Sequence, residues 1–116
     1  MATYSKHILT GSTYGRGIAV TATTSGAANT IHTVLVSVDD EVWVYAQNTT
    51  EDEVSLTVWF GGTTATSDQI YISVPSNSGL TLVVAGLVLG GNLVVKAHAE
   101  RASEVILFGY VNRLTP

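Results

Sequence analysis

The chain has 116 residues, of which 46% are hydrophobic and only 12% are charged, and its formal net charge is -4. This length favours a single domain, and five Lys and Arg residues provide no basic surface for nucleic acid. The chain has no cysteine, which excludes disulfides, cysteine-ligated zinc and thiol catalysis. The high apolar content of so small a body suggests that another chain covers part of its surface.

The N-terminal residues, MATYSKHILTGS, show no clear strand pattern and no signal peptide. We therefore expect residues 1–14 to form an N-terminal arm and residues 15–116 to form a single β-sandwich domain. The arm would either close an edge of its own sheet or lie on a neighbouring subunit. Six residues in or near it are candidates for attachment: Tyr4, Lys6, His7, Ile8, Leu9 and Arg16.

Apolar side chains recur at every second position along much of the chain, which is typical of strands with one face on a core. The weaker patterns cover residues 17–23, 30–36, 80–84 and 104–114, and the clear ones cover 41–47, 53–60, 69–74 and 93–100. Turn signals separate these segments at roughly 8–12-residue intervals. The pattern predicts an all-β fold of about eight antiparallel strands in a jelly-roll-like β-sandwich. Another Greek-key order or a closed barrel would fit the same pattern.

The longest apolar run, GLTLVVAGLVLGGNLVV at residues 79–95, approaches the roughly 20 residues of a membrane-spanning helix. Glycines interrupt it every few residues, and Gly91-Asn92 is a turn signal. The pieces between the glycines are rich in Val and Leu and have the length of strands. We therefore predict two buried strands joined by a tight connection at Gly90 to Asn92, and no membrane span.

Residues that carry chemistry are sparse. His98 and Glu100 share a predicted strand face, where a two-ligand metal site is conceivable, but a solvated polar stripe with Lys96 is the simpler interpretation. The acidic groups at residues 39–41 and 51–53 are expected to mark solvated turns. No sequence motif for catalysis or phosphate binding is present. We expect no enzymatic activity, no metal and no cofactor.

Four aromatic side chains lie opposite the aliphatic stripe of their predicted strands: Trp43, Tyr45, Trp59 and Tyr71. Exposed Trp and Tyr are enriched in the cores of protein–protein interfaces, so these four are candidates for such a surface. Two structural explanations compete, because aromatic residues also form cross-strand pairs and because both faces of a sheet can be partly buried. A sugar-binding platform is a further alternative.

Three stretches together resemble the small all-β virion proteins of tailed bacteriophages: HILTGSTYGRGIAV, QIYISVPSNSGLTLVVAGLVLGG and LFGYVNRLTP. The resemblance implies a structural role, foremost as a capsid decoration (cement) protein. Such a protein is made in the host cytoplasm and sits on the outer surface of the phage head. It would form a homotrimer and contact the major capsid protein or other virion proteins.

An alternative within this resemblance is a tail, neck or fibre-associated protein. A separate alternative, based on the exposed aromatic residues, is a carbohydrate- or receptor-binding β-sandwich module. The resemblance carries over no catalytic or cofactor-binding residues. We expect no nucleic-acid partner, because basic residues are few, and no membrane partner, because glycines interrupt the apolar run.

Overall fold

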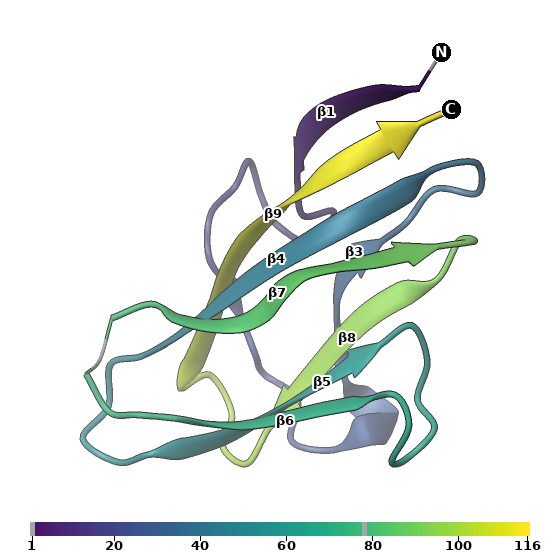
Figure 1. Cartoon of the computed structure of the whole chain (residues 1–116). Coiled ribbons are helices and arrows are strands. Elements are labelled where there is room, and N and C mark those ends of the chain that lie inside the picture. Colours follow the sequence, from purple (N-terminus) through teal and green to yellow (C-terminus); the bar gives the residue numbers. More distant parts are fainter. Residues whose placement is uncertain (1, 78) are drawn as a thin grey trace.

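The computed structural model describes residues 2–77 and 79–116, which form two antiparallel sheets packed face to face (Figure 1). The first sheet has the order β1 (Thr3–Ile8), β9 (Val105–Thr115), β4 (Asp39–Asn48) and β7 (Thr81–Gly90), and β2 (Ile18–Ala19) also pairs with β9. The second has the order β3 (Asn29–Thr33), β8 (Val94–Ala99), β5 (Val54–Phe60) and β6 (Gln69–Val74). The prediction of an all-β sandwich is confirmed, with nine strands in the described chain.

Helical structure in the described residues is confined to one 3-10 turn, η1 (Ser25–Ala27). No helix in this part of the chain has the length and apolarity needed to cross a bilayer.

The core consists of the aliphatic stripes that alternation along the strands predicted. On β4, Val42, Val44 and Ala46 are fully buried, whereas the residues between them are partly exposed. From the second sheet, Leu56 and Val58 of β5 complete the same hydrophobic cluster. Because side chains of a strand alternate between its two faces, each sheet turns one aliphatic face inward and one more polar face outward.

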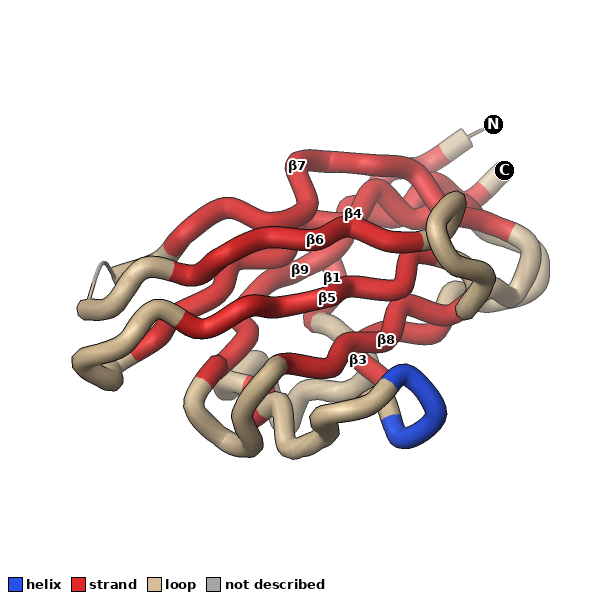
Figure 2. The backbone as a smooth tube through the Cα atoms, turned by 90° about the horizontal axis from the view of Figure 1, so that it is seen from below, coloured by secondary structure: helices blue, strands red, loops and turns tan. Residues whose placement is uncertain are grey.

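The two sheets are aligned so that edge strands meet at the sides of the sandwich. β6 and β7 lie side by side at one side (Figure 2). At the other side, the segment that follows β1 is hydrogen-bonded to β3, where the Gly11 amide donates to the Ile31 carbonyl oxygen at 2.9 Å. Both sides of the sandwich are therefore formed by the outermost strands of the two sheets.

The N-terminal segment forms a strand on its own sheet, although its sequence shows no clear strand pattern. β1 pairs along the C-terminal half of β9, from Thr3 opposite Thr115 to Ile8 opposite Tyr110. β2 continues the same edge of β9 at Ile106 and Leu107. The chain termini consequently lie next to each other at one end of the sandwich (Figure 1).

The long apolar run differs in part from its prediction. A turn does follow Gly90, but β7 extends without a break over residues 81–90, lies at a sheet edge and exposes much of its surface. β7 is therefore not a buried strand, and β8 continues in the other sheet. Gly86 marks a bulge with a φ of 73°, and a Cβ there would lie 2.7 Å from Cζ2 of Trp43. The glycine signals a bulge and a close side-chain approach, and it does not end the strand.

The assignment of which β5 side chains point into the core can be tested with Val58→Asp, which places an unpaired charge there. We expect a loss of several kcal/mol, enough to unfold a domain whose stability is about 5–15 kcal/mol. Ser73→Asp, at an exposed position on the neighbouring strand β6, is the control and should change stability little. Chemical denaturation monitored by circular dichroism measures both, and equal effects would show that the assignment is wrong.

Candidate functional site

The four aromatic candidates do not form one surface. Trp43 and Tyr45 belong to β4 and lie on the outer face of the five-stranded sheet. Trp59 and Tyr71 belong to β5 and β6 and lie on the outer face of the four-stranded sheet. Because the two sheets pack through their inner faces, these two pairs point in opposite directions.

Trp43 is held in a row of side chains that crosses the five-stranded sheet. Its ring stacks on Tyr110 of β9, with the centroids 6.3 Å apart, and its other neighbour is Gly86 of β7. The ammonium group of Lys6 on β1 lies 4.9 Å from the centroid of the Tyr110 ring. Cross-strand aromatic and cation–π contacts of this kind stabilise a sheet without any partner. The row therefore supports the structural explanation for Trp43.

Hydrogen bonds to Glu41 extend this row. The indole Nε1 of Trp43 donates to Glu41 Oε1 at 2.7 Å, and the side-chain amide of Asn112 donates to the same oxygen at 3.0 Å. These two bonds, first that of Asn112 and then that of Trp43, hold the pKa of Glu41 below its usual value. The carboxylate thus fixes the orientation of the Trp43 ring on the sheet.

Trp59 is buried although it lies on the outer face, with only 3% of its surface exposed. Its ring stacks on His98 of the adjacent strand β8, and its Nε1 donates to His98 Nδ1 at 2.9 Å. Nδ1 must then be unprotonated, so the neutral imidazole carries its hydrogen on Nε2. Burial lowers the pKa of His98. This pair matches the expectation that both faces of a sheet can be partly buried, and it leaves Trp59 no free surface for a partner.

The His98 and Glu100 stripe has structural contacts of its own. Glu100 Oε1 accepts a hydrogen bond from the Ser55 amide at 2.8 Å, while His98 Nδ1 is occupied by Trp59. Within residues 2–77 and 79–116, no three His, Cys, Asp or Glu side chains come together in a way that could hold a metal ion.

Tyr71 is the most open of the four aromatic candidates, with 67% of its surface exposed. It belongs to the β6–β7 side, a name we use for the exposed apolar residues Tyr71, Leu80, Leu82, Leu87 and Val88. Residues 69–95, which include both strands, contain no Asp, Glu, Lys, Arg or His. β6 and β7 are thus partly exposed strands whose own side chains carry no charge at neutral pH.

The candidate attachment residues are distributed over the N-terminal strand and the loop after it. Tyr4 and Ile8 are exposed, and Lys6 covers Tyr110. His7 is hydrogen-bonded to Ser5 Oγ, and Leu9 is buried in the core. Arg16 is exposed in the loop between β1 and β2, beside Tyr14, which is 93% exposed. Leu9 is therefore an anchor within this chain and is not accessible to a partner.

A buried ionic cluster lies between the two sheets and was missed by sequence reasoning. Asp40 of β4 and His32 of β3 have no exposed surface, and Arg113 of β9 has a side chain that is 12% exposed. Arg113 Nε donates to Asp40 Oδ1 at 2.9 Å and Nη2 donates to Oδ2 at 3.1 Å. The interpretation of residues 39–41 as a solvated turn is therefore wrong, because β4 already begins at Asp39 and alternation turns Asp40 inward.

The hydrogen bonds of His32 define its tautomer. Its Nδ1 accepts a bond from the Thr10 amide at 3.1 Å, so Nδ1 carries no proton. Its Nε2 therefore carries the hydrogen and donates it to Asp40 Oδ2 at 2.6 Å. The cluster consists of a neutral imidazole, an ionised carboxylate and a guanidinium, and every charged group in it is paired.

Opposing effects act on the acidity of this cluster. Burial alone would raise the pKa of Asp40, but the hydrogen bonds from Arg113 and His32 together outweigh it and hold the pKa below its ordinary value. The hydrogen bond to Asp40 likewise raises the pKa of Arg113. Both groups therefore remain charged at neutral pH.

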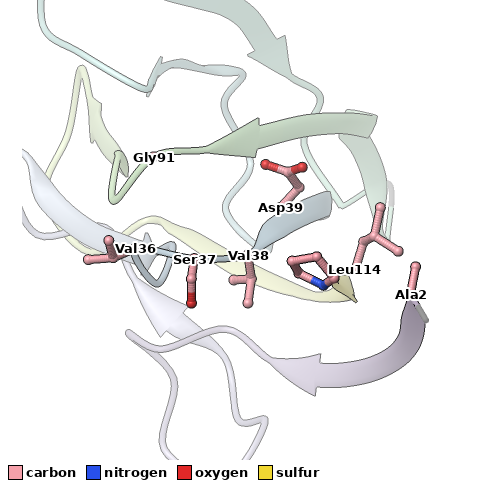
Figure 3. Close-up of a pocket in the computed structure, with 8 residues that line it drawn as sticks. Ala2, Val36, Ser37, Val38, Asp39, Gly91 and Leu114 are labelled. Atoms are coloured by element: carbon pink, nitrogen blue, oxygen red, sulfur yellow. The ribbon is translucent and has the colours of Figure 1, made fainter.

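A hollow of about 290 Å³ opens beside the chain termini (Figure 3). Its lining includes Val36, Val38 and Leu114, and Asp39 provides the one ionisable side chain among the described residues around it. A binding site of small-molecule size combines an apolar lining with several converging polar groups. The side chains around this hollow supply mainly an aliphatic surface.

Comparison with known proteins adds one structural neighbour. No protein-family model matches the chain, and no curated protein matches it in sequence. A solved chain described as "Bacillus endospore appendages form a novel family of disulfide-linked pili" has a similar fold, with a TM-score of 0.56 and 19% identity. The match covers 98% of this chain and 88% of that chain. At this identity the likeness shows a shared fold, and the absence of cysteine here leaves no counterpart to the disulfide linkage.

The buried ion pair can be tested with Arg113→Met, which leaves the Asp40 carboxylate unpaired. We expect a loss of about 3–5 kcal/mol in the free energy of unfolding at pH 7. Arg101→Met is the control, because Arg101 forms only solvent-accessible pairs, with Asp52 at 3.4 Å and with Glu104 at 3.5 Å, and it should cost less than about 1 kcal/mol. Because the pKa of Asp40 is lowered in the folded state, its ionised carboxylate contributes stability that is lost as the pH falls below about 4. The difference in the free energy of unfolding between wild type and Arg113→Met, which is the advantage of wild type, should therefore shrink in acid. An advantage that persists unchanged at pH 3 would contradict this assignment.

The Trp59–His98 pair predicts a separate pH dependence. Because the pKa of His98 is lowered in the folded state, its contribution to stability is complete above about pH 6.5 and declines as the pH falls through the folded value. We expect urea unfolding, followed by tryptophan fluorescence, to show a smaller acid-induced loss of stability in His98→Asn than in wild type. His7→Asn, at a strand without core contacts, should behave like wild type. Identical pH profiles for His98→Asn and wild type would refute the assignment.

Proposed function

We propose that this protein is a structural subunit that associates with copies of itself through its β6–β7 side. The single observation that supports this most strongly is the exposure of Leu82, Leu87 and Val88 on the edge strand β7, which contains no charged residue. Exposed apolar side chains gathered on an unpaired edge strand are a feature of protein contact sites. Charged residues are depleted at the cores of such contacts.

The geometry of β7 indicates how the contact forms. Its pairing with β4 shifts register twice, between Val42 and Trp43 and between Val44 and Tyr45, so that bulges interrupt the hydrogen-bonded ladder. Bulges twist an edge strand and discourage continuous pairing with another chain. We therefore propose that side chains of the β6–β7 side, and not an extended backbone ladder, carry most of the contact between copies.

Within this structural role, we propose capsid decoration of a tailed bacteriophage head as the specific function. The resemblance of three stretches of the sequence to small phage virion proteins supports this role. A compact sandwich with short turns and an apolar side suits a closed homotrimer, which can bind several capsid subunits at once, so that weak contacts add together. The partners would be other copies of this chain and the major capsid protein, on the outer surface of the virion.

A second candidate is a subunit of a fibrous appendage, including a phage tail or fibre. The fold shared with a chain described as forming pili favours it. Without cysteine, such a polymer would rely on non-covalent contacts alone. The two candidates differ in closure, because a decoration protein forms a small ring and an appendage subunit forms an open filament.

Light scattering at micromolar concentration tests the shared proposal. We expect wild type to form a trimer, or a growing filament for the second candidate, and Val88→Lys to shift it toward monomer. Tyr14→Lys is the matched control, because Tyr14 is even more exposed but lies away from the β6–β7 side. A strictly monomeric wild type that also fails to co-sediment with phage heads would overturn the proposal.

A further inference from the structure

The N-terminal strand β1 is held to the body of the protein by its backbone pairing with β9 and by Lys6 over the Tyr110 ring. None of the described side chains of residues 3–8 is buried, and β1 pairs with β9 alone. A segment with few buried apolar contacts and solvent-exposed backbone hydrogen bonds opens at a low cost in free energy. Attachment therefore depends on the residues that follow, where Leu9 enters the core and residues 10–11 bind β3.

Thr10 forms the link between this segment and the buried cluster. Its amide donates to His32 Nδ1 at 3.1 Å, and its hydroxyl oxygen accepts a bond from the Thr33 amide at 2.7 Å. The first of these bonds exists only while His32 is neutral, because Nδ1 has no lone pair once it is protonated. Nε2 already donates to Asp40, so a second proton on the ring can only go to Nδ1.

The groups around His32 act on its protonated form in opposite ways. Asp40 of β4 faces the ring and would form an ion pair with the imidazolium, whereas Arg113 of β9 and burial oppose the added charge. His7 of β1 lies on the same face of the five-stranded sheet as Asp40 and Arg113, and it is hydrogen-bonded to Ser5. Proton uptake by His32 would keep the bond to Asp40 and break the bond to Thr10.

We infer that His32 is an acid-sensitive latch for the N-terminal strand. Protonation at Nδ1 places an N–H group opposite the Thr10 amide, removes one of the contacts that hold residues 9–11 and sets two donors against each other there. Residues 3–8 then leave β9, and the edge of β9 from residue 110 to 115 becomes free for another strand. The inference is independent of the proposed function, because it concerns contacts within one chain.

Residue-resolved NMR of the full chain between pH 7.5 and pH 5 tests this latch. Nitrogen shifts of the histidine rings report their tautomers and protonation, and amide exchange, corrected for the intrinsic rate at each pH, reports opening. We expect the Nε2–H tautomer of His32 at pH 7.5. As His32 takes up a proton, protection of residues 3–8 should fall by about tenfold to a hundredfold, while β4, β5 and β8 keep theirs.

The controls separate the latch from other titrations. His7→Ala should leave the midpoint of the β1 transition unchanged. The inference is overturned if β1 keeps its protection while His32 becomes protonated, or if its loss follows the titration of His7. It is also overturned if His32 stays neutral until the whole chain unfolds.

Discussion

The placement of charge is the physical constraint on which this structure depends. An ionised side chain must stay in water or be paired within the protein, because an isolated buried charge is too costly. Near β1 and β3 the protein buries a paired cluster of Asp40, Arg113 and His32. On the opposite side, residues 69–95 contain no acidic, basic or imidazole group. The two sides of one sandwich are therefore suited to different roles.

The buried cluster acts on the arrangement of the strands more than on net stability. Replacing a buried ion pair by apolar groups is often neutral, whereas removing one partner is costly. Here Asp40 and Arg113 belong to neighbouring strands of one sheet and His32 belongs to the other. Their directional bonds therefore favour one alignment of the two sheets, and through Thr10 they also position the N-terminal segment. A purely aliphatic core would define that alignment less strictly.

Alternation along the strands made most of the fold predictable, but the site depended on contacts distant in sequence. Asp40 is in phase with Val42 and Val44, and this parity was a usable signal that three consecutive acidic residues obscured. His32 gave no such signal, because the register of β3 shifts between Thr30 and His32. Trp59 was correctly placed on the outer face, yet its burial depends on His98, 39 residues away.

The central claim is that the β6–β7 side is covered by other copies of the chain in solution. Hydroxyl-radical footprinting, read out by mass spectrometry at increasing protein concentration, measures this most directly. The account predicts that modification of Tyr71, Leu82 and Val88 falls as the protein associates, while modification of the exposed Tyr14 stays constant. Equal reactivity of all four residues at every concentration would contradict it.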